Sequence, residues 1–199
     1  MIGGMPKIDA ATVKEHRQSM STKLLDAAEE LLLTAGPHAL TAAAVAGAVG
    51  IARNSVYRYV DSMDTLRGQV VARYLPTWTA AVTAAVAQAS TPRDRLLAYV
   101  HANLSQAADS GHGALIQLAR GLPAAALAPV AAAHAALARL LGEQCQALDP
   151  TGAKLTAQFV QAILEIGFSE LDAGAPLAQI QHRCTQAVAA LVDARQDTN

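Results

Sequence analysis

The sequence predicts an all-α protein on the basis of three observations. Hydrophobic residues make up 52% of the 199 residues but aromatic residues only 4%, so the core must be built from small and aliphatic side chains. Long β-branched runs are scarce, and apolar positions recur at intervals of three and four, as in amphipathic helices. Gly-Pro, Thr-Pro and Asp-Pro pairs interrupt the chain at several points, as expected at helix ends.

The first helix is marked at both ends. Thr12 and Glu15 have the spacing of a capping box, which predicts a helix that starts near Val13. Its apolar positions recur with helical period until Gly36-Pro37 breaks the pattern. We therefore expect a helix over residues 13–35.

Three shorter helices are expected before residue 76. Leu40-Thr41 caps a helix of about two turns, which ends at Gly50 because a residue without Cβ permits a tight reversal. Another helix follows almost at once, and Asp61 or Ser62 caps the next one, which Pro76 ends. The expected helices are residues 42–49, 53–60 and a last one from about 63 to 75.

Longer helices are expected beyond Pro76. Thr91-Pro92 and Asp149-Pro150 each pair a capping side chain with proline at the first helical position. The expected helices lie near residues 77–89, 92–109, 113–121, 126–147, 151–172 and 177–195. No glycine-rich linker intervenes, and we expect two domains, 1–75 and 76–199.

Composition and cysteine usage limit the function classes. The formal net charge of −1 argues against coating nucleic acid by bulk charge. Cys145 and Cys184 have no metal-binding spacing, and the start of the chain has no apolar signal segment, so a cytoplasmic location is expected. Residues 124–141 are alanine-rich and include charged and proline residues, which predicts a core helix and no membrane span.

An enzyme is the least favoured alternative. The sequence contains no nucleophile–base pair, clustered carboxylates, metal-ligand spacing or phosphate-binding loop, and GAVGIAR lacks the glycine spacing of a dinucleotide fingerprint. We therefore expect no catalytic residues, no metal site and no cofactor.

Residues 50–60, GIARNSVYRYV, concentrate aromatic and basic side chains in a chain that has only four tyrosines. Two short helices around a tight turn are typical of a helix-turn-helix, whose second helix enters the major groove of DNA. Val56 and Val60 are four residues apart and face inward together, which leaves the polar positions outward. The candidate DNA-binding residues are Thr41, Arg53, Asn54, Ser55, Tyr57, Arg58 and Tyr59.

Residues 20–72 resemble the DNA-binding segment of the tetracycline-repressor (TetR) family of bacterial regulators. The resemblance includes the Leu40-Thr41 entry, Gly50-Ile51 and the Val56–Tyr59 core. It implies a homodimeric repressor of transcription with an N-terminal domain, residues 1–75, that binds a palindromic operator in double-stranded DNA. The C-terminal domain, residues 76–199, would dimerise and bind an effector.

The segment departs from the family pattern at three positions. Ala52, Val60 and Met63 stand where the family commonly has a polar cap, a phenylalanine and a lysine. The first loses a cap oxygen and the last a phosphate contact.

The charged residues of the first helix have two interpretations. Lys14, His16, Arg17 and Lys23 either contact backbone phosphate or simply solvate the helix. For the 53–59 stretch, the alternative is a solvated face of a small helix.

The C-terminal domain is expected to bind a small apolar or amphipathic effector in an alanine-rich cavity. The polar or aromatic residues best suited to orient such a ligand are Trp78, His101, Asn103, Gln117, His134, Gln158, Gln161 and Glu165. Each of them alone has a structural alternative, as a core or surface residue.

Dimerisation is expected to use the last two helices. One apolar stripe comprises Leu155, Phe159, Ala162, Ile163 and Ile166, and the other Leu177, Ile180, Cys184, Ala187, Val188 and Leu191. Two helices from each subunit would form a four-helix interface. The alternative is that both stripes face their own core, and a helical interaction module without DNA binding remains the rival function.

Overall fold

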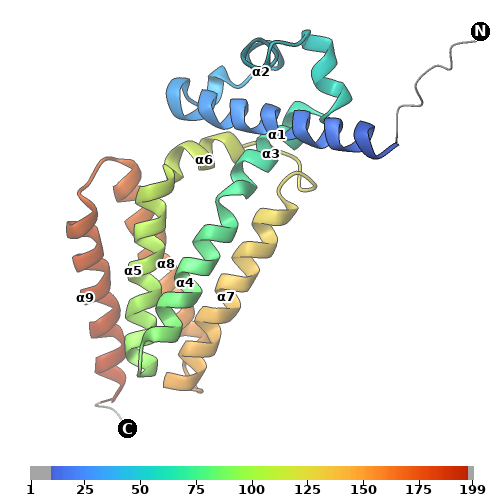
Figure 1. Ribbon diagram of the computed structural model, residues 1–199. Coiled ribbons are helices and arrows are strands. Elements are labelled where there is room, and N and C mark those ends of the chain that lie inside the picture. The colour runs from blue at the N-terminus through green and yellow to red at the C-terminus, as the bar shows by residue number, and fades with distance from the viewer. Residues whose placement is uncertain (1–9, 197–199) are drawn as a thin grey trace, which may run out of the picture. The chain divides into compact units, whose positions relative to one another are not determined.

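The structure, a computed structural model, describes residues 10–196, with side chains described for residues 13–194. The described residues form helices joined by short turns, and they contain no strand (Figure 1). The elements are α1 (Ala10–Ala35), η1 (Pro37–Ala39), α2 (Ala42–Val49), η2 (Arg53–Arg58), α3 (Met63–Arg73), α4 (Leu75–Gln88), α5 (Pro92–Ser110), α6 (His112–Ala119), α7 (Ala128–Leu148), α8 (Ala153–Asp172) and α9 (Leu177–Gln196). The prediction of an all-α protein is confirmed.

The chain divides into two compact units. The first comprises Met1–Val70 and Gly121–Ala126, and the second comprises Val71–Arg120 and Leu127–Asn199. The division into residues 1–75 and 76–199 remains a prediction, and it does not anticipate that residues 121–126 belong to the first unit.

The first unit is built on α1, which packs against η1 and α2, while α2 packs against η2. Its core is aliphatic, as the composition predicts, and comprises Leu24, Ala28, Leu32, Leu40, Val45, Val56, Leu66 and Val70. The side chain of Arg67 donates a hydrogen bond of 3.1 Å to the carbonyl oxygen of Leu40, so α3 is joined to the turn before α2.

The second unit is a helix bundle with α5 against α4, α7, α8 and α9 (Figure 1). Its fully buried side chains include Val82, Leu96, Val100, Leu104, Cys145, Val160 and Val188. Tyr99 is also in this core, and its hydroxyl donates to the carbonyl oxygen of Leu137 at 3.3 Å. Burial raises the pKa of Tyr99 to about 12, so the hydroxyl keeps its proton and remains a donor.

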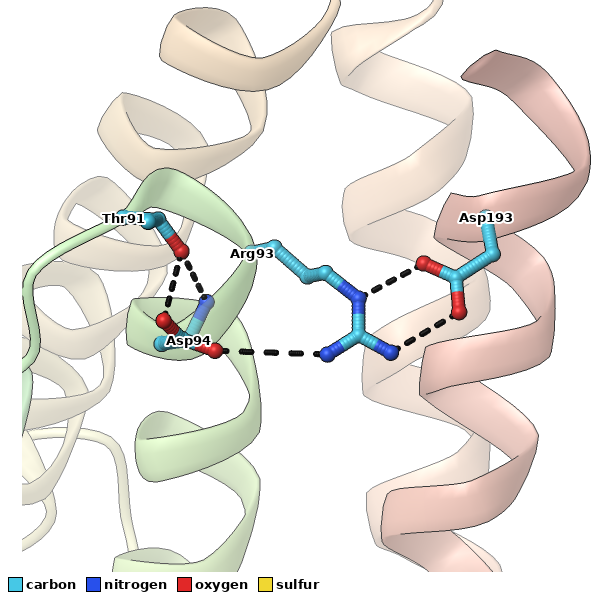
Figure 2. Close-up of polar contacts among 4 residues, drawn as sticks. All are labelled: Thr91, Arg93, Asp94 and Asp193. Atoms are coloured by element: carbon cyan, nitrogen blue, oxygen red, sulfur yellow. Dashed lines mark hydrogen bonds and ion pairs between the residues drawn. The ribbon is translucent and has the colours of Figure 1, made fainter. Parts of the chain in front are cut away.

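The first turn of α5 is capped and tied to the last turns of α9 (Figure 2). The Thr91 hydroxyl accepts from the Asp94 amide at 3.1 Å and donates to the Asp94 carboxylate at 2.7 Å, which confirms the predicted helix start. Arg93 donates two hydrogen bonds to Asp193, of 2.6 and 2.8 Å. These bonds hold the pKa of the Asp193 carboxyl below its usual range, because they favour its charged form.

Several predicted helix ends are wrong for local reasons. α1 begins at Ala10, so Thr12 lies inside the helix and is not its cap. Pro76 lies in the first turn of α4, where a missing amide hydrogen costs nothing, and does not end a helix there. Asp149 accepts from the amide of Thr151 at 3.0 Å in a turn, and α8 starts only after Gly152. Asp149-Pro150 therefore does not open a helix.

Half of the predicted apolar stripe of α9 faces its own unit, whereas Ala187 is exposed and Leu177 and Leu191 are half-buried, so the part of this stripe in a dimer interface remains a prediction. Ile180, Cys184 and Val188 are buried in the core. Gly167 on α8 serves the same packing, because a Cβ there would lie 2.7 Å from Leu104 and 3.1 Å from the Cys184 sulfur. The small residue thus allows close approach within one chain.

Both cysteines are buried, and neither forms a disulfide. Burial raises the pKa of the Cys184 thiol, as expected for a small buried apolar residue and not for a reactive thiolate. Along residues 10–196, no helix combines the length and apolar character needed to cross a bilayer.

Candidate functional site

The candidate site in the first unit is the pair of elements α2 and η2. The Thr41 hydroxyl accepts from the amide of Ala44 at 3.2 Å and caps α2. Gly50 ends this helix with φ 77°, a left-handed conformation that side chains disfavour, and the Ile51 amide donates to Ala46 at 3.0 Å. The sequence therefore produces the tight reversal expected between the two elements.

The second element, η2, is a 3₁₀ helix over Arg53–Arg58 and not the expected α-helix over residues 53–60. Ala52 precedes it and provides no side-chain cap, and the amide of Ser55 donates to the Ala52 carbonyl at 2.8 Å. Val56 and Val60 are both buried, as their spacing predicts. The second element of the motif is thus anchored by two valines.

The candidate DNA-binding residues lie around this anchor. The exposed residues are Thr41, Arg53, Asn54, Tyr57 and Arg58, and Ser55 and Tyr59 are half-buried. Tyr57 keeps 49% of its surface exposed although it is a large aromatic residue in a protein that has few. An exposed tyrosine next to Arg58 and on the same short element as Arg53 is suited to phosphate and base contacts, since all three groups donate hydrogen bonds.

Tyr59 is held from two sides by α1. The Ser21 hydroxyl donates to the Tyr59 carbonyl at 3.2 Å. The His16 ring lies edge-on to the Tyr59 ring, with centroids 6.4 Å apart and planes at 69°. The C-terminal end of η2 is thereby fixed against the N-terminal half of α1.

Two of the eight predicted ligand-binding residues meet in the second unit. The indole Nε1 of Trp78 donates to the Asn103 side-chain oxygen at 2.8 Å, and the Asn103 amide donates to the Tyr99 carbonyl at 2.8 Å. Asn103 is only 3% exposed, so α4 and α5 share a buried and satisfied polar contact.

The other predicted ligand-binding residues do not join this contact in the single chain. They are exposed, on α5, α6, α7 and α8, and comprise His101, Gln117, His134, Gln158, Gln161 and Glu165. His101 instead lies 3.4 Å from the Gln181 side chain. Their role in ligand binding stays a prediction.

Sequence reasoning missed three residues beside Trp78. Its ring lies 6.0 Å from both His112 and Phe168, which are themselves 4.8 Å apart. The Nδ1 atom of His112 lies 3.1 Å from an Asp172 carboxylate oxygen. We name Trp78, Asn103, His112, Phe168 and Asp172 the aromatic cluster. It joins residues far apart in sequence, and no local motif marks them.

Asn103→Leu is expected to destabilise the second unit. The substitution leaves the half-buried indole donor of Trp78 without its acceptor, which should cost about 1 kcal/mol, the lower end of the range for a buried donor. Trp78 is the only tryptophan, so urea unfolding followed by its fluorescence reports on this unit. Gln117→Leu, at an exposed position of α6, is the control and should leave the midpoint unchanged. Equal midpoints for wild type and both variants would contradict the role given to this hydrogen bond.

These features define a class: a helical protein with an N-terminal helix-turn-helix and a separate C-terminal helix bundle, as in DNA-binding transcriptional regulators. Residues 24–70 match the family model of bacterial regulatory proteins, tetR family. This segment of the chain is therefore similar to the DNA-binding segment of the tetR family of bacterial regulatory proteins.

Solved structures share this fold along most of the chain. A tetR-family regulatory protein from Rhodococcus RHA1 is 19% identical, with a TM-score of 0.67 over 86% of this chain and 96% of that one. FadR from Bacillus subtilis, in complex with stearoyl-CoA, is 13% identical, with a TM-score of 0.66 over 84% and 97%. A protein described as superantigen pfit is 23% identical, with a TM-score of 0.61 over 83% and 86%.

At these identities the likeness concerns the fold. A comparison with curated protein sequences finds no match. Within residues 13–194, no group of three or more His, Cys, Asp and Glu side chains is placed to hold a metal ion.

Proposed function

We propose that this DNA-binding regulator is a homodimeric repressor that binds a palindromic operator and is released by a small apolar or amphipathic effector. The observation that carries the proposal is the outward face of η2. Arg53, Asn54, Tyr57 and Arg58 are exposed there, while Val56 is fully buried and fixes the element. Arg or Asn can reach base edges in the major groove, and Tyr and Arg bind phosphate.

The homodimer is supported by an exposed apolar stripe on α8. Leu155, Phe159 and Ile166 are 48%, 43% and 63% exposed, and Ala162 lies between them on the same face. Exposed large apolar side chains in one row mark an interaction surface. Because a two-fold axis needs one self-complementary patch, we propose that a second copy of this chain covers the stripe.

The effector is supported by the character of the second unit. Its core is aliphatic, and the aromatic cluster supplies a few polar groups among apolar ones, the usual composition of a ligand site. The stearoyl-CoA bound to Bacillus subtilis FadR is amphipathic, with a long apolar chain and a charged head. We expect the effector of this protein to be of the same broad chemical kind.

In the proposed release, effector binding and DNA binding are linked equilibria. A ligand that weakens DNA binding must bind more tightly to the protein when DNA is absent, and operator DNA must weaken ligand binding by the same factor. Titrating a compound found by screening, with and without operator, tests this step. Equal affinities in the two titrations would identify a bound compound that is not an effector.

Substitutions on η2 are expected to weaken DNA binding in two different ways. Arg53→Ala removes a base-edge contact, with a cost of about 1–3 kcal/mol and relaxed specificity, whereas Arg58→Ala removes a phosphate contact and weakens all sequences evenly. Tyr57→Phe, which removes only a hydroxyl, should resemble Arg58→Ala. The measurement is a salt-controlled gel shift on DNA upstream of the protein's own gene, beside a scrambled duplex.

The control for these variants is Arg139→Ala, because Arg139 on α7 is exposed and forms only a 3.8 Å pair with Glu143. It should bind DNA like the wild type. Unchanged DNA binding in all three η2 variants, with helicity intact, would show that the proposed face of η2 does not enter the groove. A wild-type protein that binds no DNA would favour the rival function, a helical interaction module.

A further inference from the structure

One face of α1 changes character along the helix. Leu24 and Ala28 are buried in the core of the first unit, and Ser21, one turn earlier on the same face, is half-buried. Residues three and four apart lie on one side of a helix, so Arg17 and Lys14 continue this face toward the N-terminus. Both are exposed, and the face that packs the core therefore ends in two positive charges.

This face is attached directly to the candidate DNA-binding element. The Ser21 hydroxyl donates to the Tyr59 carbonyl at the C-terminal end of η2. The His16 ring, on the neighbouring side of α1, packs against the Tyr59 ring. Arg17 lies one helical turn beyond Ser21, and Lys14 lies one turn beyond Arg17. The two charges thus continue past the end of η2 on a helix whose position relative to η2 is fixed.

The structure gives Lys14 and Arg17 no polar partner among the described side chains. Among the residues with described side chains, 13–194, neither Lys14 nor Arg17 forms an ion pair or side-chain hydrogen bond. Glu15, the nearest acid in sequence, points to the opposite side of the helix from Arg17, at two residues' rotation. Lys23 is also exposed but lies on a different face of α1.

We propose that Lys14 and Arg17 form a phosphate clamp that binds the DNA backbone beside the groove occupied by η2. The proposal rests on the proposed function and assigns a second contact surface to it. A cationic pair on a rigid helix is suited to the regularly spaced phosphates of duplex DNA, and such contacts set position without reading sequence. It also separates Lys14 and Arg17 from Lys23, which the sequence alone groups together.

The clamp predicts a specific change in salt dependence. Each phosphate neutralised contributes roughly 0.9 to the slope of log affinity against log salt concentration. Two residues in each subunit of a dimer make four contacts, so Lys14→Ala with Arg17→Ala should make the slope shallower by roughly 3 to 4. Affinity at low salt should fall at least about tenfold, equally for specific and nonspecific DNA.

The experiment uses the full-length protein and a fluorescein-labelled 30-base-pair duplex of random sequence, so that no operator is needed. Anisotropy titrations at several salt concentrations compare the wild type, the Lys14/Arg17 double variant, Lys23→Ala and Arg58→Ala. Lys23→Ala removes one positive charge per subunit from the same helix, whereas the double variant removes two, and it is the control when slopes are compared per charge. Circular dichroism melts test whether the variants are folded. If the alanine substitutions alter folding, Lys14→Gln with Arg17→Gln removes the charges and keeps most of the side-chain length.

The proposal is supported if the slope changes in the Lys14/Arg17 variants and not in Lys23→Ala. It is overturned if Lys23→Ala lowers the slope as much per charge removed, because any positive charge on α1 would then contribute equally, whatever its position. It is also overturned if Arg58→Ala weakens binding while the Lys14/Arg17 slope stays at the wild-type value. If the wild-type protein binds neither this duplex nor the DNA upstream of its gene, the proposed DNA-binding function is itself wrong, and the clamp proposal fails with it.

Discussion

Replacing both Phe159 and Ile166 by glutamate is expected to convert the protein into a monomer. The variant should no longer bind a two-half-site operator at protein concentrations that saturate the wild type. Half-sites lie about 34–36 Å apart on DNA, and only a dimer presents two recognition elements at a fixed spacing. A monomer would retain weak, salt-sensitive binding to single half-sites.

The expected effect is large because a two-fold interface contains each of these side chains twice, once from each subunit. Phe159 and Ile166 leave much of their surface exposed in the single chain, and burial of such a side chain contributes up to about 1.5–3 kcal/mol. Four copies would be lost from one interface. Each glutamate would also bring an unpaired carboxylate into an apolar contact, which is unfavourable without a partner.

Sedimentation velocity at micromolar concentration measures the outcome. Ile116→Glu is the matched control, because Ile116 on α6 is a large apolar residue that is 44% exposed but lies outside the α8 stripe. It should leave the dimer intact. A wild-type monomer that still binds DNA, or a double variant that remains dimeric, would show that the α8 stripe is not the interface.

Local signals in the sequence were sufficient for the helix-turn-helix. Thr41 and Gly50 mark the ends of α2 because a hydroxyl cap and a left-handed glycine act within one turn of the chain. The inward pair Val56 and Val60 was also predictable from spacing. The 3₁₀ form of η2 was not, because apolar residues four apart do not distinguish a short 3₁₀ helix followed by a turn from an α-helix.

Signals with two structural uses gave the wrong helix ends. An aspartate before proline is typical of a helix start, but Asp149 accepts from the Thr151 amide in a turn and α8 begins later. Proline at position 76 is equally compatible with a helix end and with a first turn, and here it lies in a first turn. The choice depends on packing beyond the local sequence.

Contacts between distant residues account for what remained hidden in the second unit. The sequence singled out Trp78 and Asn103 by residue type, but His112, Phe168 and Asp172 join them only because α4, α5, α6 and α8 meet. Periodicity likewise gave α8 and α9 similar apolar stripes. The α8 stripe is largely exposed, whereas Ile180, Cys184 and Val188 of the α9 stripe are buried, and only tertiary packing distinguishes the two.

Gly68→Ala is expected to destabilise the first unit, whereas Gly47→Ala should stabilise it. A Cβ at Gly68 would clash with the carbonyl oxygen of Ala126 and lie 3.1 Å from its carbonyl carbon, so residues 121–126 would have to move off α3. Overpacking of this kind typically costs about 1–3 kcal/mol, which outweighs the gain of about 0.5–1 kcal/mol from replacing a helical glycine. At Gly47 a Cβ meets nothing within 4 Å, and only the gain remains.

The two variants make the same chemical change in helices of the same unit, so their difference isolates the contact with residues 121–126. Since the protein has two units and its only tryptophan lies in the second, tryptophan fluorescence would not report on this change. Hydrogen exchange followed by mass spectrometry resolves it, because peptides from α2 and α3 report on opening of the first unit. Faster exchange is expected there for Gly68→Ala and slower exchange for Gly47→Ala. Equal protection in both variants would mean that residues 121–126 yield without cost and do not hold α3 in place.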